Sequence, residues 1–162
     1  MSTESKYQLP KTQDVKRSYL STILSCRCPR CRQSHLFEDK NPYHLRNTMK
    51  MHKACPTCGQ PTEIEVGFYT GAAYVSYALT VAIAVAVFVA WYVLIGFTMS
   101  DLSDFRIFWC LLTTVAVIVA VTPYIMRVSR SIWLSLFVKY DKHWRDNGIS
   151  DYERVNPIGM EK

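Results

Sequence analysis

The sequence predicts a mainly α membrane protein, in which two transmembrane helices form a hairpin between a small cysteine-rich module and an amphipathic helix. Three observations lead to this fold class. Two long apolar stretches lie in the second half of the chain, two CxxC motifs lie in the first half, and an amphipathic pattern follows the second apolar stretch. Polar and apolar regions are separate, so the chain does not read as one ordinary soluble domain.

The first 23 residues, 1–23, are polar and basic, and we expect them to be flexible. They contain no apolar core of the kind that a secretory signal needs. Export by that route is therefore not expected, and the cysteines that follow are expected to stay reduced.

Residues 72–97 and 107–126 carry no charge, and each run reaches the roughly 20 residues that a helix needs to cross a bilayer. We assign transmembrane helices to 67–97 and 107–126 and a short periplasmic loop to 98–106. The alternative is a soluble protein with two core helices, which stretches of this length disfavour.

Aromatic side chains near the ends of both runs predict anchoring at the membrane interface. The predicted interfacial residues, including those of the following amphipathic helix, are Tyr69, Tyr74, Trp91, Trp109, Tyr124, Trp133, Phe137 and Trp144.

Charge predicts the orientation of the hairpin. The loop carries Asp101, Asp104 and a single Arg106, whereas the segment after the second run is rich in Lys and Arg. By the positive-inside rule both termini face the cytoplasm. Neither run contains an ionisable residue of the kind that proton or ion pathways use, so a pump or transporter is not expected.

Small residues recur every four positions in the first run, at Ala82, Ala86 and Ala90, and Gly67 and Gly71 precede them. Helices approach closely along such rows. We expect the protein's own two helices to pack there, with a homodimer or a larger partner as the alternative.

The segment 127–145 has apolar residues at helical spacing on one side and cations largely elsewhere, which predicts an amphipathic helix. It is expected to lie at the membrane interface against lipid or against the protein's own cysteine module, with an outside partner as the alternative. The tail, 146–162, is polar and predicted to be flexible.

Two CxxC turns, Cys28 to Cys31 and Cys55 to Cys58, predict a zinc ribbon over residues 24–66. Each turn offers two thiolates, and together they supply the four ligands of a tetrahedral zinc ion. Gly59 permits the positive φ that a knuckle often needs after its second cysteine, whereas Arg32 occupies that place in the first turn.

We expect the zinc to be structural, because so short a module buries little apolar surface and the metal would supply its stability. Reversible thiol chemistry or metal delivery is the alternative. Cys26 is a candidate auxiliary thiol, and Cys110 is expected to be an ordinary small apolar residue. The histidines between the turns, His35, His44 and His52, are weaker ligand candidates. Cations beside the cysteines would offset the charge of the site: Arg27, Arg30, Arg32 and Lys53.

Several motifs in order resemble the bacterial family catalogued as domain of unknown function 983. These are CPRC at 28–31, LF at 36–37, PY at 42–43, CPTCG at 55–59, the glutamates at 63 and 65, GFYTGAAYVSYA at 67–78 and RSIWLSLFVKYD at 130–141. The resemblance covers most of the chain, and Arg32 and Cys26 depart from the common pattern. It implies a small inner-membrane protein with a zinc-ribbon-like segment and two helices. It also implies, by gene association, a role in assembling respiratory complexes such as haem-copper oxidases.

Three functions are compatible with these features. The first is a non-catalytic adaptor, accessory subunit or assembly factor for a membrane protein complex. The second is a metal or thiol chaperone, and the third, which we consider the least favoured, is a membrane-tethered nucleic-acid-binding ribbon. No Ser-His-Asp set, phosphate loop or HExxH motif is found, so we do not expect an enzyme.

Overall fold

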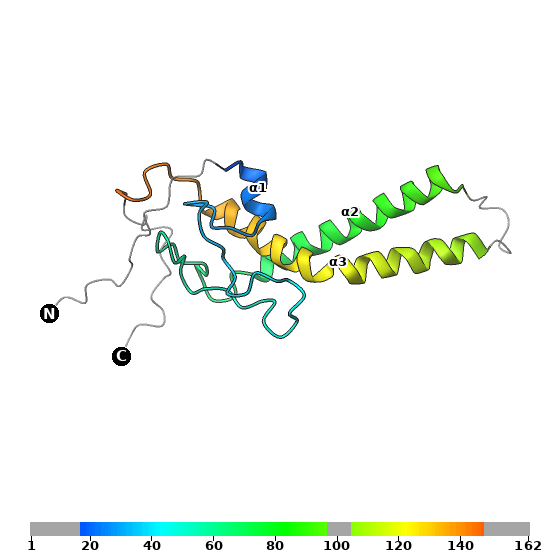
Figure 1. The fold of residues 1–162 in the computed structure, drawn as a ribbon, viewed down its shortest axis with the longest axis horizontal. Coiled ribbons are helices and arrows are strands. Elements are labelled where there is room, and N and C mark those ends of the chain that lie inside the picture. Colours follow the sequence, from blue (N-terminus) through cyan, green and yellow to red (C-terminus); the bar gives the residue numbers. More distant parts are fainter. Residues whose placement is uncertain (1–16, 97–104, 148–162) are drawn as a thin grey trace.

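The computed structural model describes residues 17–96 and 105–147, and its helices follow the order α1 (Tyr19–Leu24), α2 (Thr70–Leu94) and α3 (Phe105–Phe137). Helices α2 and α3 lie side by side as a long hairpin, and the chain between α1 and α2 forms an irregular lobe at one end of it (Figure 1). We call residues 25–66 the cysteine lobe. A mainly α fold with two long apolar helices and a four-cysteine cluster in the N-terminal region is confirmed.

Helix α2 begins at Thr70, three residues after the predicted start, because Gly67 has a left-handed backbone with φ of 78°. The Thr70 hydroxyl donates a hydrogen bond to the Gly67 carbonyl at 2.8 Å. At the other end Gly96, with φ of 66°, follows the last turn, as is common after a helix C-terminus. The helix is about 37 Å long at 1.5 Å per residue, enough to cross a bilayer.

Helix α3 corrects the expectation of a membrane helix over 107–126 and a separate amphipathic helix over 127–145. One helix runs through Pro123 to Phe137, and it bends part-way along its length (Figure 1). Proline lacks the N–H that would bond the preceding turn, which is an ordinary cause of such a bend. After Phe137 the chain leaves the helix and turns back onto the cysteine lobe, where Val138 and Trp144 are buried.

Both long helices leave their apolar stretches exposed. No residue in the most apolar window of α2 is buried, and only 6% of that window in α3 is. The core helices of soluble proteins bury such residues, so the hairpin has the surface of helices that could cross a membrane. Threonine hydroxyls within the helices donate to carbonyls one turn earlier, as in Thr80 to Ser76 and Thr122 to Ile118.

The small residues of α2 divide into two groups. Gly71 faces α3, because a Cβ built on it would lie 2.1 Å from the Trp133 ring. Ala82, Ala86 and Ala90 are exposed, so the expectation that the two helices of this chain pack along the alanine row is wrong. Helix α2 packs against α3 through a different face, and the three alanine side chains are exposed on the surface.

The segment before the cysteines corrects the expectation of a flexible N-terminal stretch over 1–23. Residues 19–24 form α1, which packs on α3. The Tyr19 hydroxyl lies 3.0 Å from the Ser135 hydroxyl, and the Tyr124 hydroxyl donates to the Leu24 carbonyl at 2.9 Å. The rest of the predicted flexible N-terminus, most of the predicted periplasmic loop and most of the predicted polar tail fall on 1–16, 97–104 and 148–162, outside the described residues.

Among the described residues, an apolar core joins the cysteine lobe to the end of α3. Its buried members come from α1, from the lobe and from the end of α3 and the turn after it: Ile23, Cys26, Cys28, Cys31, Leu36, Phe37, Cys55, Val128, Leu134, Val138 and Trp144. The lobe is therefore packed against the C-terminal part of α3 and is not connected to the hairpin by the chain alone.

Candidate metal centre

Four thiols converge in the cysteine lobe. The sulfurs of Cys28, Cys31, Cys55 and Cys58 all lie within 4.8 Å of one another. The Sγ atoms of Cys28 and Cys58 are 3.7 Å apart, as are those of Cys31 and Cys55. A tetrahedron with zinc–sulfur bonds of about 2.3 Å has edges of about 3.8 Å, so this geometry fits a tetrahedral four-thiolate zinc ion. A buried cysteine cluster that could hold a metal such as zinc is thus confirmed.

The two CxxC turns have nearly the same backbone. In the first, the Arg32 N–H donates to the Cys28 carbonyl at 2.8 Å, and in the second the Gly59 N–H donates to the Cys55 carbonyl at 2.9 Å. Each turn is closed by an antiparallel bridge, between Arg27 and His35 and between residues 54 and 61. The repeated geometry directs two sulfurs from each turn toward a common point.

Arg32 takes the place that a glycine takes in the second turn. Its φ is 57°, close to the 73° of Gly59, so the first turn uses the left-handed conformation without a glycine. That conformation costs roughly 1 kcal/mol for a residue with a Cβ. The Arg32 side chain offsets this cost, because it donates to the Arg17 carbonyl at 2.7 Å and lies 4.0 Å over the Tyr140 ring.

The thiols influence one another strongly. Hydrogen bonds from Cys28, and then from Cys31 and Cys58, hold the pKa of the Cys55 thiol well below its usual range. The Ser34 hydroxyl lies 2.9 Å from the Cys55 sulfur and favours the thiolate in the same way. The pKa of Cys28 is raised by its hydrogen bonds with Cys31, Cys55 and Cys58 and by burial. Four thiols so close together share their protons, and a dication would replace those protons.

The other sulfur and imidazole candidates lie outside this cluster. Cys26 is buried, and burial raises the pKa of its thiol to about 11, outweighing the charge of Arg127, which acts in the opposite direction. Cys110 is buried in α3. The histidines between the turns, His35, His44 and His52, are not part of the four-cysteine cluster. The His44 Nδ1 instead lies 2.6 Å from an Asp39 carboxylate oxygen.

Arg30 fastens the chain after α3 to the first CxxC turn. Its buried guanidinium lies 3.6 Å from the Asp141 carboxylate and donates to the Asn147 carbonyl at 2.9 Å. Burial acts to raise the pKa of Asp141, but hydrogen bonds from His143 and Asn147 and the charge of Arg30 outweigh it and hold the pKa below its usual range. The carboxylate is therefore ionised at neutral pH.

Arg127 fastens the opposite side of the lobe to α3. This side chain is only 3% exposed, and it donates to the Thr48 carbonyl at 2.9 Å and to the Asp39 carbonyl at 2.8 Å. Its guanidinium also lies 4.8 Å over the Phe37 ring. Arg127 is the first charged residue after the second apolar run, so the lobe is anchored where the hairpin ends.

The predicted interfacial residues have different surroundings. Tyr74, Trp109 and Phe137 are well exposed on the hairpin, whereas Trp91 is partly buried. Tyr69 and Tyr124 direct their hydroxyls to backbone carbonyls of the protein. Trp133 packs against Gly71. The assignment of Trp144 to the membrane interface is wrong, because the ring is buried in the core of the cysteine lobe.

Sequence reasoning missed the roles of Arg30, Ser34 and Arg127. A signal for Arg127 existed, because a cation directly after an apolar run is bound to lie near the membrane boundary. Nothing in the sequence indicated that it would bind backbone carbonyls of the loop between the two CxxC turns.

No family model, curated protein or solved structure matches this chain.

Proposed function

We propose that this protein is a non-catalytic membrane adaptor: a zinc-stabilised cytoplasmic lobe, held rigidly on a two-helix membrane hairpin, on which a membrane protein complex is assembled. The resemblance to the domain of unknown function 983 family supports a location in a bacterial inner membrane. It also makes respiratory complexes the first candidates for the partner.

The attachment of the lobe to α3 is the observation that carries the proposal. Buried Arg127 binds two carbonyls of the lobe, and the cysteine cluster shares one core with Leu134 and Val138. An adaptor has to present a fixed surface, because flexible surfaces lose binding energy to ordering. A lobe that shares a core with its membrane helix presents such a fixed surface, whereas a ribbon on a flexible linker does not.

The burial of the thiols argues against metal delivery. Cys28, Cys31 and Cys55 are each at most 2% exposed, and Cys58 is partly exposed. A chaperone has to bring its ligands to a partner's metal site, whereas a site with four thiolates in a closed core has no open coordination position. Zinc in such a site would stabilise the lobe, with an apparent binding free energy of about 10–16 kcal/mol.

The surroundings of the hairpin support a bilayer as its environment. Leu24 lies beside Tyr124 at the end of the second apolar run, and its side chain is exposed. Leu45 and Tyr43, in the loop anchored by Arg127, are exposed as well. Exposed apolar side chains next to the predicted membrane boundary would contact the interfacial region of the lipid, with both termini in the cytoplasm.

The proposal is tested by purifying the tagged full-length protein in mild detergent and analysing its metal content and its co-purifying proteins together. We expect one zinc per chain and a stoichiometric membrane partner. Arg127→Leu removes the two hydrogen bonds that hold the loop between the CxxC turns on α3, and it is expected to retain zinc and weaken binding of the partner. Lys139→Leu removes an exposed cation close by and is expected to keep both.

Two outcomes would contradict the adaptor. Unchanged binding of the same partner by Arg127→Leu would show that the fixed position of the lobe is not what the partner recognises. Substoichiometric or mixed metal that exchanges readily, with only transient partners, would instead favour a metal chaperone.

A further inference from the structure

The loop between the two CxxC turns is fixed to α3 at both of its ends. Arg127 donates one hydrogen bond to the Asp39 carbonyl, at 2.8 Å, and one to the Thr48 carbonyl, at 2.9 Å. One turn further along α3, Arg130 donates to the Met49 carbonyl at 3.2 Å. The loop therefore lies beside α3 at the point where the second apolar run ends and the hairpin meets the cysteine lobe (Figure 1).

The charge of this loop has one sign, and we call residues 40–50 the basic loop. From Lys40 to Lys53 the sequence contains four Lys or Arg residues and no Asp or Glu, although Glu38 and Asp39 precede it. Within the part of the chain that the structure describes, no ion pair involves the exposed cations of the basic loop, which are Lys40, Arg46 and Lys50. Their charge is therefore available to a negatively charged surface.

The basic loop also exposes two large apolar side chains, Tyr43 at 59% and Leu45 at 77%. The turn that carries them is fixed, because the Thr48 hydroxyl lies 2.9 Å from the Pro42 carbonyl and 2.8 Å from the His44 carbonyl and donates to them. Less conformational entropy is lost when a fixed turn binds. Exposed aromatic and aliphatic side chains among cations are typical of segments that enter the interfacial region of a bilayer.

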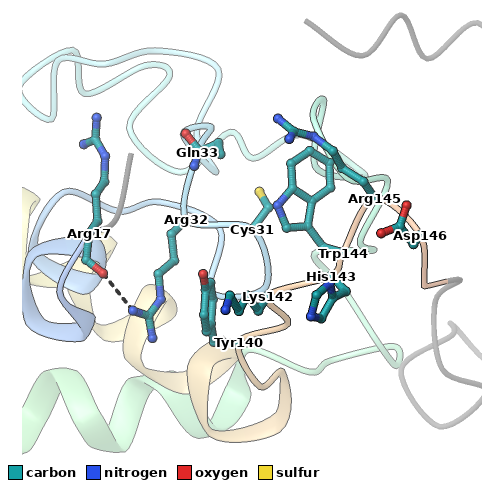
Figure 2. A pocket seen from close by; sticks show the side chains of 10 residues that line it. All are labelled: Arg17, Cys31, Arg32, Gln33, Tyr140, Lys142, His143, Trp144, Arg145 and Asp146. Atoms are coloured by element: carbon teal, nitrogen blue, oxygen red, sulfur yellow. Dashed lines mark hydrogen bonds between the residues drawn. The ribbon is translucent and has the colours of Figure 1, made fainter. Parts of the chain in front are cut away.

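The cations beside the first CxxC turn do not form a comparable surface. The side chains of Arg17, Arg32 and Lys142 point apart there (Figure 2). Arg32 is engaged by the protein itself, since it donates to the Arg17 carbonyl at 2.7 Å and lies over the Tyr140 ring. The basic loop, in contrast, combines exposed cations without ion pairs and exposed apolar side chains where the apolar run ends.

We propose that the basic loop binds the headgroups of anionic phospholipids in the bilayer that holds the hairpin. Tyr43 and Leu45 would enter the interfacial region, and the cations around them would contact phosphate groups. Charge complementarity selects this partner, because the cytoplasmic surface of a bilayer is negatively charged. The inference rests on the proposed membrane location, and it does not depend on the protein partner. It gives the lobe a second attachment to the membrane, one that depends on lipid composition.

The test places a photoreactive group on the loop, as Leu45→benzoylphenylalanine, in the zinc-loaded full-length protein. The protein is illuminated in nanodiscs with equal amounts of phosphatidylglycerol and phosphatidylcholine, and mass spectrometry gives the ratio of the two lipid adducts. We expect phosphatidylglycerol adducts to exceed phosphatidylcholine adducts by more than about tenfold. Arg46→Gln and Lys50→Gln are each expected to lower this ratio about fivefold, as for the loss of one cation at an anionic surface.

A matched control removes a cation elsewhere. Lys139→Gln lies past the end of α3, is also exposed, and is expected to change the ratio less than about twofold. An equal decrease in this variant, or a ratio near one in the parent protein, would overturn the proposal. Unchanged zinc content and helical circular dichroism in each variant exclude misfolding.

Two further positions of the photoreactive group distinguish the remaining outcomes. At Leu111, which is exposed in the second apolar run, it should form adducts with both lipids, and at Lys142, past the end of α3, it should form few. Adducts at Leu111 without adducts at Leu45 would overturn the lipid contact of the loop and leave the membrane location intact. A crosslink from Leu45 to a second copy of the chain in place of lipid would overturn it too. Absence of adducts at Leu111 would overturn the membrane location itself.

Discussion

Replacing Gly71 by alanine tests how tightly the base of the hairpin is packed against α3. The new Cβ would lie 2.1 and 2.2 Å from two carbon atoms of the Trp133 ring. Carbon atoms in contact are about 3.5–4.0 Å apart, so the ring or the backbone has to move by about 1.5 Å. The ring cannot move freely, since its centroid lies 5.2 Å from that of Phe137 and 6.3 Å from that of Phe68.

The expected loss of stability follows from two opposing effects. Overpacking of this kind costs about 1–3 kcal/mol. Alanine is favoured over glycine within a helix by up to about 1 kcal/mol, which partly offsets that cost. We therefore expect Gly71→Ala to lower the free energy of unfolding by about 1–2 kcal/mol. In a Trp133→Leu background the clash is absent, and the same substitution is expected to be neutral or stabilising.

The measurement is reversible unfolding in mixed micelles with increasing sodium dodecyl sulfate, followed by far-ultraviolet circular dichroism. The four proteins of the double-mutant cycle should show a coupling of about 2 kcal/mol between the two positions. Equal effects of Gly71→Ala in both backgrounds would refute the close approach of Trp133. A stabilising effect in the wild-type background would do so as well.

Three further predictions concern the cysteine lobe. Removal of zinc by a chelator is expected to unfold the lobe and expose Trp144, while the helical signal of the hairpin persists; limited proteolysis before and after zinc is restored measures this. Cys28→Ser is expected to lose the metal and Cys26→Ala to keep one zinc per chain, by elemental analysis, and loss of zinc from Cys26→Ala would contradict the four-cysteine assignment. The pKa of Asp141 is lowered in the folded protein, so its hydrogen bonds from His143 and Asn147 and its contact with Arg30 together stabilise the fold above the usual carboxyl pKa of about 4, and this effect is lost as the pH falls through the lowered value. The difference in unfolding free energy between wild type and Asp141→Asn should therefore be constant near neutral pH and shrink in acid. A difference that grows in acid would contradict a lowered pKa of Asp141 in the folded protein.

The four-cysteine cluster could be predicted because its chemistry is local. Each CxxC turn is a short loop that brings its own two sulfurs together, and one dication needs two such loops. The left-handed backbone of Arg32 could not be predicted in the same way. The residue type argued against it, and the contacts that offset its cost, with Arg17 and Tyr140, come from distant parts of the chain.

The two long helices were also accessible from the sequence, because length and absence of charge are enough to indicate them. The continuity of α3 was not. Pro123 and the change from an apolar to an amphipathic pattern suggested two elements, but the packing of Leu134 against the lobe favours one helix. The assignment of Trp144 to the membrane interface also failed because the local sequence does not show what the ring packs against. An aromatic residue with cations around it suits a membrane interface and a protein core alike, and only the fold separates the two.

If the hairpin spans a bilayer, the continuous α3 helix would make the position of the cysteine lobe depend on the thickness of that bilayer. A helix that spans the membrane adjusts its tilt when the hydrocarbon thickness changes. In a bilayer, the part of α3 beyond the apolar run would act as a lever of about 16 Å, and a tilt of about 10° would swing its end by about 3 Å. Because Arg127 and the shared core attach the lobe along this lever, the surface offered to a partner would shift with membrane thickness.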